Sequence, residues 1–355
     1  MTDRIPVAIV GSGITGLCIG RALHEFGAGC LIFDKGRYPG GRMASFVHDG
    51  IAIDYGPNWF HTRDEILDSD LRQALIDVGA ITVDRSELPG DVISRLPAAD
   101  SVTSWKIPGG LRSLASRLAE PLEIRQRHQV RRIERHGEGW RIHGTDESDG
   151  SRPFSFDAGS VILTMPWPQV LELLRESGIT PAKDSLPPEV SEQCYDRIHV
   201  GTFLVERSPL SPSDSESVQC TNPAPLQRID WVEPPGQPDR QIVTAFADPE
   251  WSRHHFDDAP ESVMRDLVEA LRLQFGKPLQ ASVLRHHRWK FARLADPQAG
   301  NPKPLVLSDE PPLIVAGEAF GVRSNSPAGL LSAQASAAMT FRLLEAGDTG
   351  RSGLA

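Results

Sequence analysis

The chain has 355 residues, of which 39% are hydrophobic, so it is long enough to bury one large core or two medium ones. Its formal net charge is −10, which speaks against nucleic acid and anionic membranes as partners, since both require basic surfaces. The four cysteines form no C-x-x-C pair, which argues against a zinc or dithiol site and suits a reducing compartment. No stretch reaches the roughly 20 apolar residues of a membrane span. We therefore expect a cytoplasmic globular protein with no membrane span and no bound metal.

The first elements along the chain form a β-α-β unit. Apolar runs and helical spacing predict a strand at 7–10, a helix at 14–27 and a strand at 30–34. Gly11, Gly13 and Gly16 stand between the first strand and the helix, and Asp34 ends the second strand. The first glycine permits a tight turn, the second lets the backbone approach a pyrophosphate, and the third allows close packing of helix and strand. The helix N-terminus offers N–H groups to phosphates and Asp34 can bind ribose hydroxyls, so this unit predicts dinucleotide binding.

The rest of the chain predicts a second domain inserted between two parts of the first. The expected elements are a β-meander within 120–166 that ends in an apolar strand at 160–164, an amphipathic helix at 260–275, an apolar strand at 313–318 and a small-residue helix at 327–344. The strands typical of a nucleotide domain thus lie at both ends of the chain. We expect a cofactor-binding domain from 1–62, 98–167 and 281–350, and a substrate domain from 63–97 and 168–280.

A turn with two glycines and an arginine follows Asp34, within the stretch 37–45. Its R-x-x-GGR-x-x-S pattern resembles the flavin-containing amine oxidase superfamily. The resemblance implies that the Gly40-Gly41 turn brings the chain back under the pyrophosphate and that Arg42 contacts a phosphate, which suits the planar guanidinium. It also implies that the dinucleotide is a resident, noncovalent FAD, where the glycines alone would equally suit a nicotinamide.

Two further segments resemble the flavin end of the same superfamily. Residues 54–60 resemble its D-x-G-A-x-(Y/W)-F segment, which passes beside the flavin ring. At the other end of the chain, Gly317-Glu318 resembles a Gly-Asp pair whose acid binds the ribityl chain, although glutamate is one methylene longer. Residues 327–335 resemble the helix whose N-terminus stabilises negative charge on the reduced ring, with Pro-Ala-Gly in place of Glu-Gly-Ala.

Two segments narrow the resemblance to the renalase-like branch of bacterial proteins. Residues 105–112 resemble its W-x-G-x-P-G-M segment, and residues 285–293 resemble its H-R-W-x-Y-A-R-P strand. The resemblance implies an α/β fold with a Rossmann-like FAD-binding domain. It also implies a discontinuous second domain on a mostly antiparallel sheet, the topology shared by p-hydroxybenzoate hydroxylase and the amine oxidases.

The motifs and the resemblance together give the expected cofactor-binding residues. These are Gly11, Ser12, Gly13, Ile14, Thr15, Gly16, Asp34, Lys35, Gly41, Arg42, Met43, Gly56, Pro57, Asn58, Trp59, Val130, Gly317, Glu318, Pro327, Ala328, Gly329 and Leu330.

The expected active site is a pocket rather than a catalytic triad, because a flavin itself carries the difficult step of a hydride transfer. Trp59 and Trp289 are candidates for its walls, His61 for a substrate contact, and Lys290 for holding a water near flavin N5. Trp289 could instead be a core aromatic residue of a strand, and the alternation of the strand could point Lys290 outward. The histidines of 251–255 lack a third ligand in register and do not indicate a metal.

The resemblance implies an FAD-dependent oxidase that takes a hydride from a small reduced substrate, an amine or a dihydronicotinamide, and passes electrons to molecular oxygen. One alternative is a specialised oxidase or desaturase of secondary metabolism, because the middle of the chain matches the branch only in outline. Another is a binding protein without redox chemistry on the same fold. An NAD-dependent dehydrogenase is disfavoured by the GGR turn and the C-terminal Gly-Glu strand. The sequence gives no indication of the oligomeric state.

Overall fold

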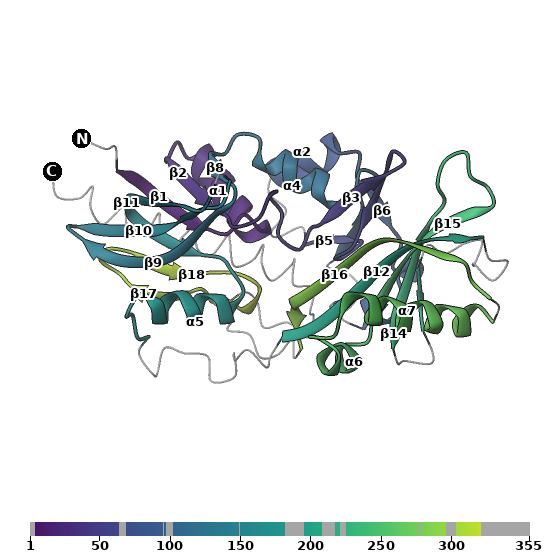
Figure 1. The fold of residues 1–355 in the computed structure, drawn as a ribbon. Coiled ribbons are helices and arrows are strands. Elements are labelled where there is room, and N and C mark those ends of the chain that lie inside the picture. Colours follow the sequence, from purple (N-terminus) through teal and green to yellow (C-terminus); the bar gives the residue numbers. More distant parts are fainter. Residues whose placement is uncertain are drawn as a thin grey trace.

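The computed structural model describes residues 4–63, 69–94, 96, 102–148, 150–181, 195–207, 217–220, 225–276, 278–295 and 303–320. Two large sheets occupy opposite ends of an elongated molecule, and smaller strands and helices lie between them (Figure 1).

The first large sheet has eight strands. Its main order is β17 (Leu305–Ser308), β18 (Leu313–Val315), β11 (Arg152–Leu163), β1 (Ile5–Val10), β2 (Cys30–Phe33) and β8 (Ile124–Arg125). The pairs β18–β11, β11–β1, β1–β2 and β2–β8 are parallel, which is the pairing of a Rossmann-like sheet. Strand β17 is antiparallel at the edge.

Both faces of this sheet are covered, as the continuous apolar runs of its strands require. Ile9 packs on one face with Ile19 of α1 (Ile14–Glu25). Val10 faces the other way and belongs to the core that includes Val170 of α5 (Trp167–Glu176). The period-2 alternation of side chains along β1 therefore separates the two cores.

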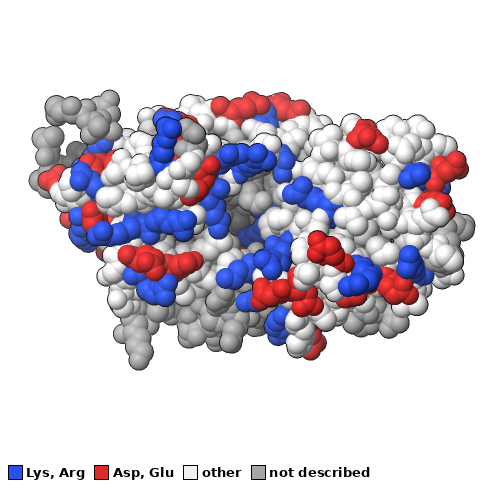
Figure 2. Space-filling model, viewed as in Figure 1, with Lys and Arg blue, Asp and Glu red and all other residues white. Residues whose placement is uncertain are grey.

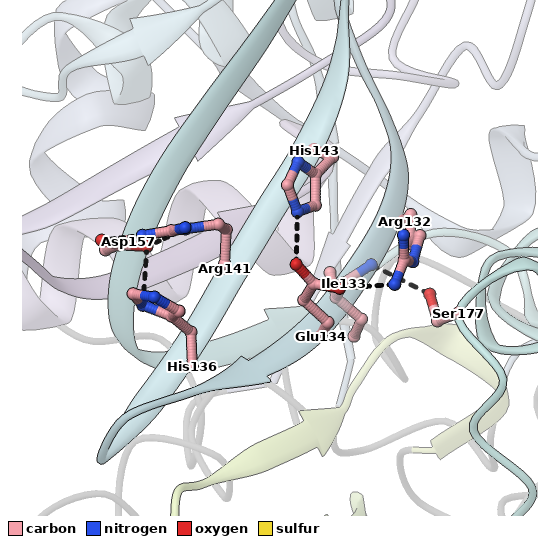
Figure 3. A network of polar contacts seen from close by, with 8 residues as sticks. All are labelled: Arg132, Ile133, Glu134, His136, Arg141, His143, Asp157 and Ser177. Atoms are coloured by element: carbon pink, nitrogen blue, oxygen red, sulfur yellow. Dashed lines mark hydrogen bonds and ion pairs between the residues drawn. The ribbon is translucent and has the colours of Figure 1, made fainter.

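The predicted β-meander is present as β9 (His128–His136), β10 (Gly139–Asp146) and β11. The twelve-residue strand β11 pairs antiparallel with β10 in its first half and parallel with β1 in its second, so one strand joins the meander to the Rossmann-like sheet. Polar pairs cross the meander (Figure 3). They are Arg141 with Asp157 at 2.7 Å, His143 with Glu134 at 2.9 Å, His136 with Asp157 at 3.4 Å, and Arg132 with Glu134. These side chains are exposed or half-buried and screened by solvent, so the pairs contribute little to stability.

The second large sheet is antiparallel, in the order β13 (Ser217–Gln219), β14 (Leu226–Val232), β15 (Arg240–Ala247), β12 (Tyr195–Glu206) and β16 (Ala281–Leu294). Helix α7 (Pro260–Phe275) covers it and buries Val263, Leu267 and Leu271 against strand residues such as Phe203. The bounds of α7 are those that the sequence predicts, because apolar residues recur at helical spacing after an N1 proline. The short α6 (Pro249–His254) packs on β12.

Smaller elements fill the space between the two sheets. They are the hairpin β3 (Ser45–His48) and β4 (Ile51–Asp54), the sheet β5 (Phe60–Thr62), β7 (Thr103–Lys106) and β6 (Ile81–Val83), the helices α2 (Ser69–Asp77), α3 (Gly90–Ile93) and α4 (Leu111–Ala119), and the 3-10 turns at Arg85–Glu87 and Glu318–Phe320. Leu75 of α2, Leu114 of α4 and Leu17 of α1 belong to one core.

The division into two domains stays a prediction. Two elements pack with the sheet of the other expected domain rather than with that of their own. Strand β16 lies in the stretch expected to belong to the cofactor domain, yet it hydrogen-bonds with β12 in the antiparallel sheet. Helix α5 lies in the stretch expected to belong to the substrate domain, yet it packs on the meander of the first sheet. The helix expected at 327–344 lies outside the described residues.

Candidate active site

Four parallel strands end at one edge of the first sheet, where they meet a cavity of about 1270 Å³. Gly11 follows β1, Asp34 follows β2, Thr164 follows β11 and Gly317 follows β18, and all four residues line the cavity. Ligands of open parallel sheets bind at this edge. The volume exceeds the about 300–1,000 Å³ of ordinary small-ligand pockets, so it has room for a dinucleotide together with a second molecule.

The glycine turn after β1 forms a cradle with an open centre. Gly11 has φ +110°, which favours glycine, and a Cβ at Gly16 would lie 2.0 Å from the carbonyl oxygen of Gly11. A Cβ at Gly13 would meet no atom within 4 Å. Two of the glycines thus hold the turn closed, while Gly13 opens onto the space that a pyrophosphate needs. Helix α1 begins at this cradle, and its positive N-terminal end faces the cavity. Neither a side-chain cap nor an acidic residue in the first turn neutralises that end.

The GGR turn lies directly against this cradle. The Gly40 N–H donates to the carbonyl of Ser12 at 2.8 Å, and Gly40 forms an isolated parallel bridge with Gly13. Arg42 extends from the turn to Glu318, with 2.5 Å between Nη1 and Oε1, and also donates to the carbonyl of Ala292 at 3.1 Å. One ion pair at the cavity wall therefore joins two motifs that lie 276 positions apart in the sequence.

Asp34 ends β2 beside the same cradle. Its Oδ2 accepts from the N–H of Ser12 at 2.5 Å and from the Ser12 hydroxyl at 2.7 Å, and its Oδ1 accepts from the N–H of Gly36 at 2.6 Å. Burial lowers the pKa of Lys35, and Asp34 opposes that effect. Val130, from β9, and Lys35 also line the cavity.

These features fit an FAD. An open cradle over an uncapped helix start suits the pyrophosphate, and Asp34 lies where a ribose acid is expected. Of the sequence-predicted cofactor residues that the structure describes, all but Ser12 and Gly16 line the cavity. Those two support it from behind, Ser12 through Asp34 and Gly16 through Gly11. The predicted residues Pro327, Ala328, Gly329 and Leu330 lie outside the described residues.

An aromatic group lines the cavity beyond the GGR turn. Trp289, from β16, donates from Nε1 to the carbonyl of Tyr55 at 2.8 Å, and the two rings stack with centroids 5.8 Å apart. His287 contacts both rings, at 4.1 Å from Trp289 and 5.0 Å from Tyr55. A Cβ at Gly56 would lie 2.2 Å from the carbonyl of Arg42, so the chain turns tightly here against the cofactor segment. The structure therefore brings Trp289 to the 54–60 segment, which is 229 or more residues away in sequence.

Asp54 lies just before this aromatic group and connects it to α4. Its Oδ1 accepts from the N–H of Leu111 at 2.9 Å, at the start of α4. Burial raises its pKa from 3.8 to about 7, against the opposing effect of the Leu111 N–H. The folded protein therefore binds a proton on Asp54 that the unfolded chain releases near pH 4.

This raised pKa predicts the direction of a pH effect on stability. Between pH 3.8 and about 7 the folded state binds more protons at Asp54, so this contribution is fully present below pH 3.8 and is lost as the pH rises to about 7. Asp54→Asn removes the ionisation and keeps an acceptor for Leu111. Urea unfolding at pH 4.5 and 7.5 should show the variant gaining on the wild type by about 3 kcal/mol at the higher pH. An unchanged difference between the two pH values would contradict this assignment.

Asn58 and Trp59 form a second wall with residues of the antiparallel sheet. The Asn58 amide donates from Nδ2 to Asp230 at 2.6 Å, and Asp230 also pairs with Arg228 at 3.0 Å and accepts from Ser217. The guanidinium of Arg228 lies 5.6 Å from the ring of Trp59. Asn58 Oδ1 is buried and has no hydrogen-bond partner among the described residues. This oxygen of a cavity-lining residue is suited to accept from a bound molecule.

His61 and Lys290 line the cavity in different surroundings. His61 is buried, its Nδ1 lies 2.9 Å from the hydroxyl of Ser104, and burial lowers its pKa to about 4, so it is neutral at pH 7. Lys290 is exposed, and its charge lowers the pKa of Lys35, which follows Asp34. Lys290 is thus close to the end of the cavity that holds the ribose acid, and its expected contact with a water near N5 stays a prediction.

Several cavity residues were not among the sequence-predicted ones. They are Tyr55, Phe246, Arg228, Arg285, Arg112 and Thr164. Tyr55 stands inside the recognised 54–60 segment and could have been identified there. Arg228 and Phe246 lie on β14 and β15, whose surroundings carry no motif, and only the pairing of the strands brings them to the cavity.

Family models match both parts of the chain. Residues 90–338 match the model of flavin-containing amine oxidoreductases, and residues 9–73 match that of an NAD(P)-binding Rossmann-like domain. The chain belongs to the flavin-containing amine oxidoreductase family, and it is a flavin-dependent oxidoreductase.

Solved structures share the fold at low sequence identity. A putative protoporphyrinogen oxidase from Exiguobacterium sp. 255-15 has a TM-score of 0.63 at 16% identity over 97% of this chain and 100% of that one. Putrescine oxidase bound to putrescine has a TM-score of 0.62 at 13% identity over 97% of this chain and 99% of that one. The Rossmann-like and antiparallel architecture expected from the sequence is confirmed.

A curated relative matches over a short stretch only. The 4,4'-diapophytoene desaturase (4,4'-diaponeurosporene-forming) of Staphylococcus haemolyticus is 43% identical over 51 residues. The match covers 14% of this chain and 10% of the desaturase.

Among the described residues, no helix is both long and apolar enough to cross a membrane. The same part of the chain contains no group of three His, Cys, Asp or Glu side chains placed to hold a metal ion.

Proposed function

We propose that this protein is an oxidase that holds FAD noncovalently along the cavity and oxidises a small reduced substrate at its aromatic end. The observation that carries the proposal is the open cradle of Gly13, which faces a cavity continuous with Trp59 and Trp289. When bound, FAD accepts a hydride and a proton from the substrate and passes them to molecular oxygen, which becomes hydrogen peroxide.

In this proposal the protein residues bind the FAD and orient the substrate. The N-terminus of α1 and Arg42 hold the pyrophosphate, and Asp34 binds the ribose. Tyr55 and Trp289 form a wall that excludes water from the reacting carbon. His61 stays neutral because its pKa is about 4, so it can position a substrate but carries no charge to it. None of the described cysteines, Cys18, Cys30 and Cys220, lines the cavity, which supports noncovalent binding.

The purified protein is expected to be yellow, with an absorbance maximum at about 450 nm, and heat or acid should release the FAD into the supernatant. Anaerobic screening against amines and reduced nicotinamides should identify a substrate that bleaches this band, and air should restore it with formation of peroxide. A protein that contains no flavin and cannot be reconstituted with FAD would contradict the proposal. Retention of the flavin after denaturation would contradict noncovalent binding alone.

A desaturase is the second candidate, favoured by the short match to 4,4'-diapophytoene desaturase. In that case the protein would introduce a double bond into a hydrocarbon substrate that has no nitrogen centre. The charged lining of the cavity argues against it, because a hydrocarbon gains nothing from buried guanidinium groups.

A further inference from the structure

The cavity is basic although the chain is acidic. Ten of its lining residues are Lys or Arg and four are Asp or Glu, whereas the whole chain has a formal net charge of −10. Figure 2 shows Lys and Arg side chains around the hollow between the two ends of the molecule. The pyrophosphate of FAD neutralises only a part of this excess, since each of its phosphates carries a single charge.

Four of the eight arginines that line the cavity have a carboxylate partner among the residues that the structure describes. Arg42 pairs with Glu318, Arg228 with Asp230, Arg288 with Asp257 and Arg293 with Asp196. These ion pairs leave less positive charge for a ligand.

Arg285 differs from these four. No carboxylate pairs with it among the residues that the structure describes. Its guanidinium lies 4.1 Å from the ring centroid of Tyr55 and 5.3 Å from that of Phe46, and its Nε is buried without a hydrogen-bond partner in the described part of the chain. Stacking on rings orients a guanidinium and leaves its N–H groups to bind an anion in their plane.

The position of Arg285 suits one end of a small substrate. Arg285, His287 and Trp289 alternate along β16, and their pairing with β12 is regular, so they share one side of the strand. Arg285 is therefore about 13 Å along the strand from Trp289. A molecule whose oxidised carbon lies near Trp289 could reach Arg285 with its opposite end.

We propose that Arg285 determines specificity by binding an anionic group of the substrate, a carboxylate or a phosphate. This inference rests on the proposed function, because it concerns the substrate of that same site. A substrate whose binding group is an ammonium ion is disfavoured, since Arg285 repels it and the Asp230 carboxylate beside Asn58 already bonds with Arg228, Asn58 and Ser217. His287 adds no charge, because burial lowers its pKa to about 4.

The test titrates the FAD-loaded protein with three aromatic probes and follows the flavin absorbance. The probes are benzoate, phenylphosphonate and benzylamine, which separate a carboxylate, a phosphate-like group and an ammonium. We expect benzoate or phenylphosphonate to perturb the flavin band, the stronger of the two identifying the anion, and benzylamine to leave it unchanged. The variants are Arg285→Gln, Arg285→Lys and, as a control, Arg253→Gln on the exposed end of α6.

Arg285→Gln should weaken the binding of the anion by about tenfold or more, because a charge-assisted hydrogen bond is lost. Arg285→Lys should retain part of the affinity, and Arg253→Gln should bind as the wild type does. Both Arg285 variants should keep the resting flavin spectrum, which shows that they fold. The inference is overturned if neither anion binds, if benzylamine binds as well as the anions, or if Arg285→Gln binds them as tightly as the wild type. A wild type without flavin would instead contradict the proposed function itself.

Discussion

Gly16→Ala is expected to destabilise the protein and to abolish FAD binding. The added methyl would lie 2.0 Å from the Gly11 carbonyl oxygen and 3.2 Å from the Thr164 hydroxyl, so the turn between β1 and α1 must move. Alanine is the better helix former by about 1 kcal/mol, but overpacking against fixed backbone costs about 1–3 kcal/mol or more and prevails. Urea unfolding without added FAD should therefore show a net loss of about 2 kcal/mol.

Gly13→Ala is the matched control for this variant. Its methyl would meet no protein atom within 4 Å, and the extended backbone of Gly13, with φ −69° and ψ 177°, is open to alanine. The stability without FAD should stay within about 0.5 kcal/mol of the wild type. Equal destabilisation by both substitutions would show that the cradle is not open at Gly13.

Arg42→Met is expected to cost more stability than Glu318→Gln, although both break the same ion pair. The Glu318 side chain is 3% exposed, so without its arginine it is a buried charge, and removing one partner of such a pair costs about 3 kcal/mol. The Arg42 side chain is 29% exposed and still donates to the carbonyl of Ala292, so Glu318→Gln should cost about 1 kcal/mol. Thermal and urea unfolding of the two variants measure this asymmetry.

The control for this pair is Arg288→Met. Arg288 pairs with Asp257 at 3.3 Å, and the two side chains are 47% and 90% exposed. Such a surface pair contributes about 0–1 kcal/mol. If Arg42→Met proved as mild as this control, Glu318 would have to be stabilised without Arg42.

The parts of the fold that could be predicted from the sequence are those set by local patterns. The β-α-β unit and α7 follow from apolar runs, helical spacing, glycines and an N1 proline within short stretches. Helix α5 was not predicted, although Pro168 stands in its first turn, where proline is favourable.

The cofactor end of the site follows from motifs, but the substrate end depends on strand pairing. Arg42 and Glu318 lie 276 positions apart, and only the resemblance to a family placed both beside one ligand. Arg228 and Arg285 line one cavity with Tyr55 because β16 pairs with β12 and β15 pairs with both β12 and β14. Such registers depend on long-range packing and carry no signal in a single stretch of sequence. The basic character of the cavity could not be predicted, because the net charge of the whole chain is negative.

The most direct test of the account is the titration of FAD-free protein with FAD, followed by flavin fluorescence, for the wild type and Gly13→Ala. We predict that the wild type binds one FAD per chain and that Gly13→Ala, equally stable, binds it at least about tenfold more weakly, because the methyl occupies the space of the pyrophosphate. A wild type that binds no FAD, or a Gly13→Ala variant that binds it as tightly as the wild type, would contradict the placement of the cofactor in this cavity.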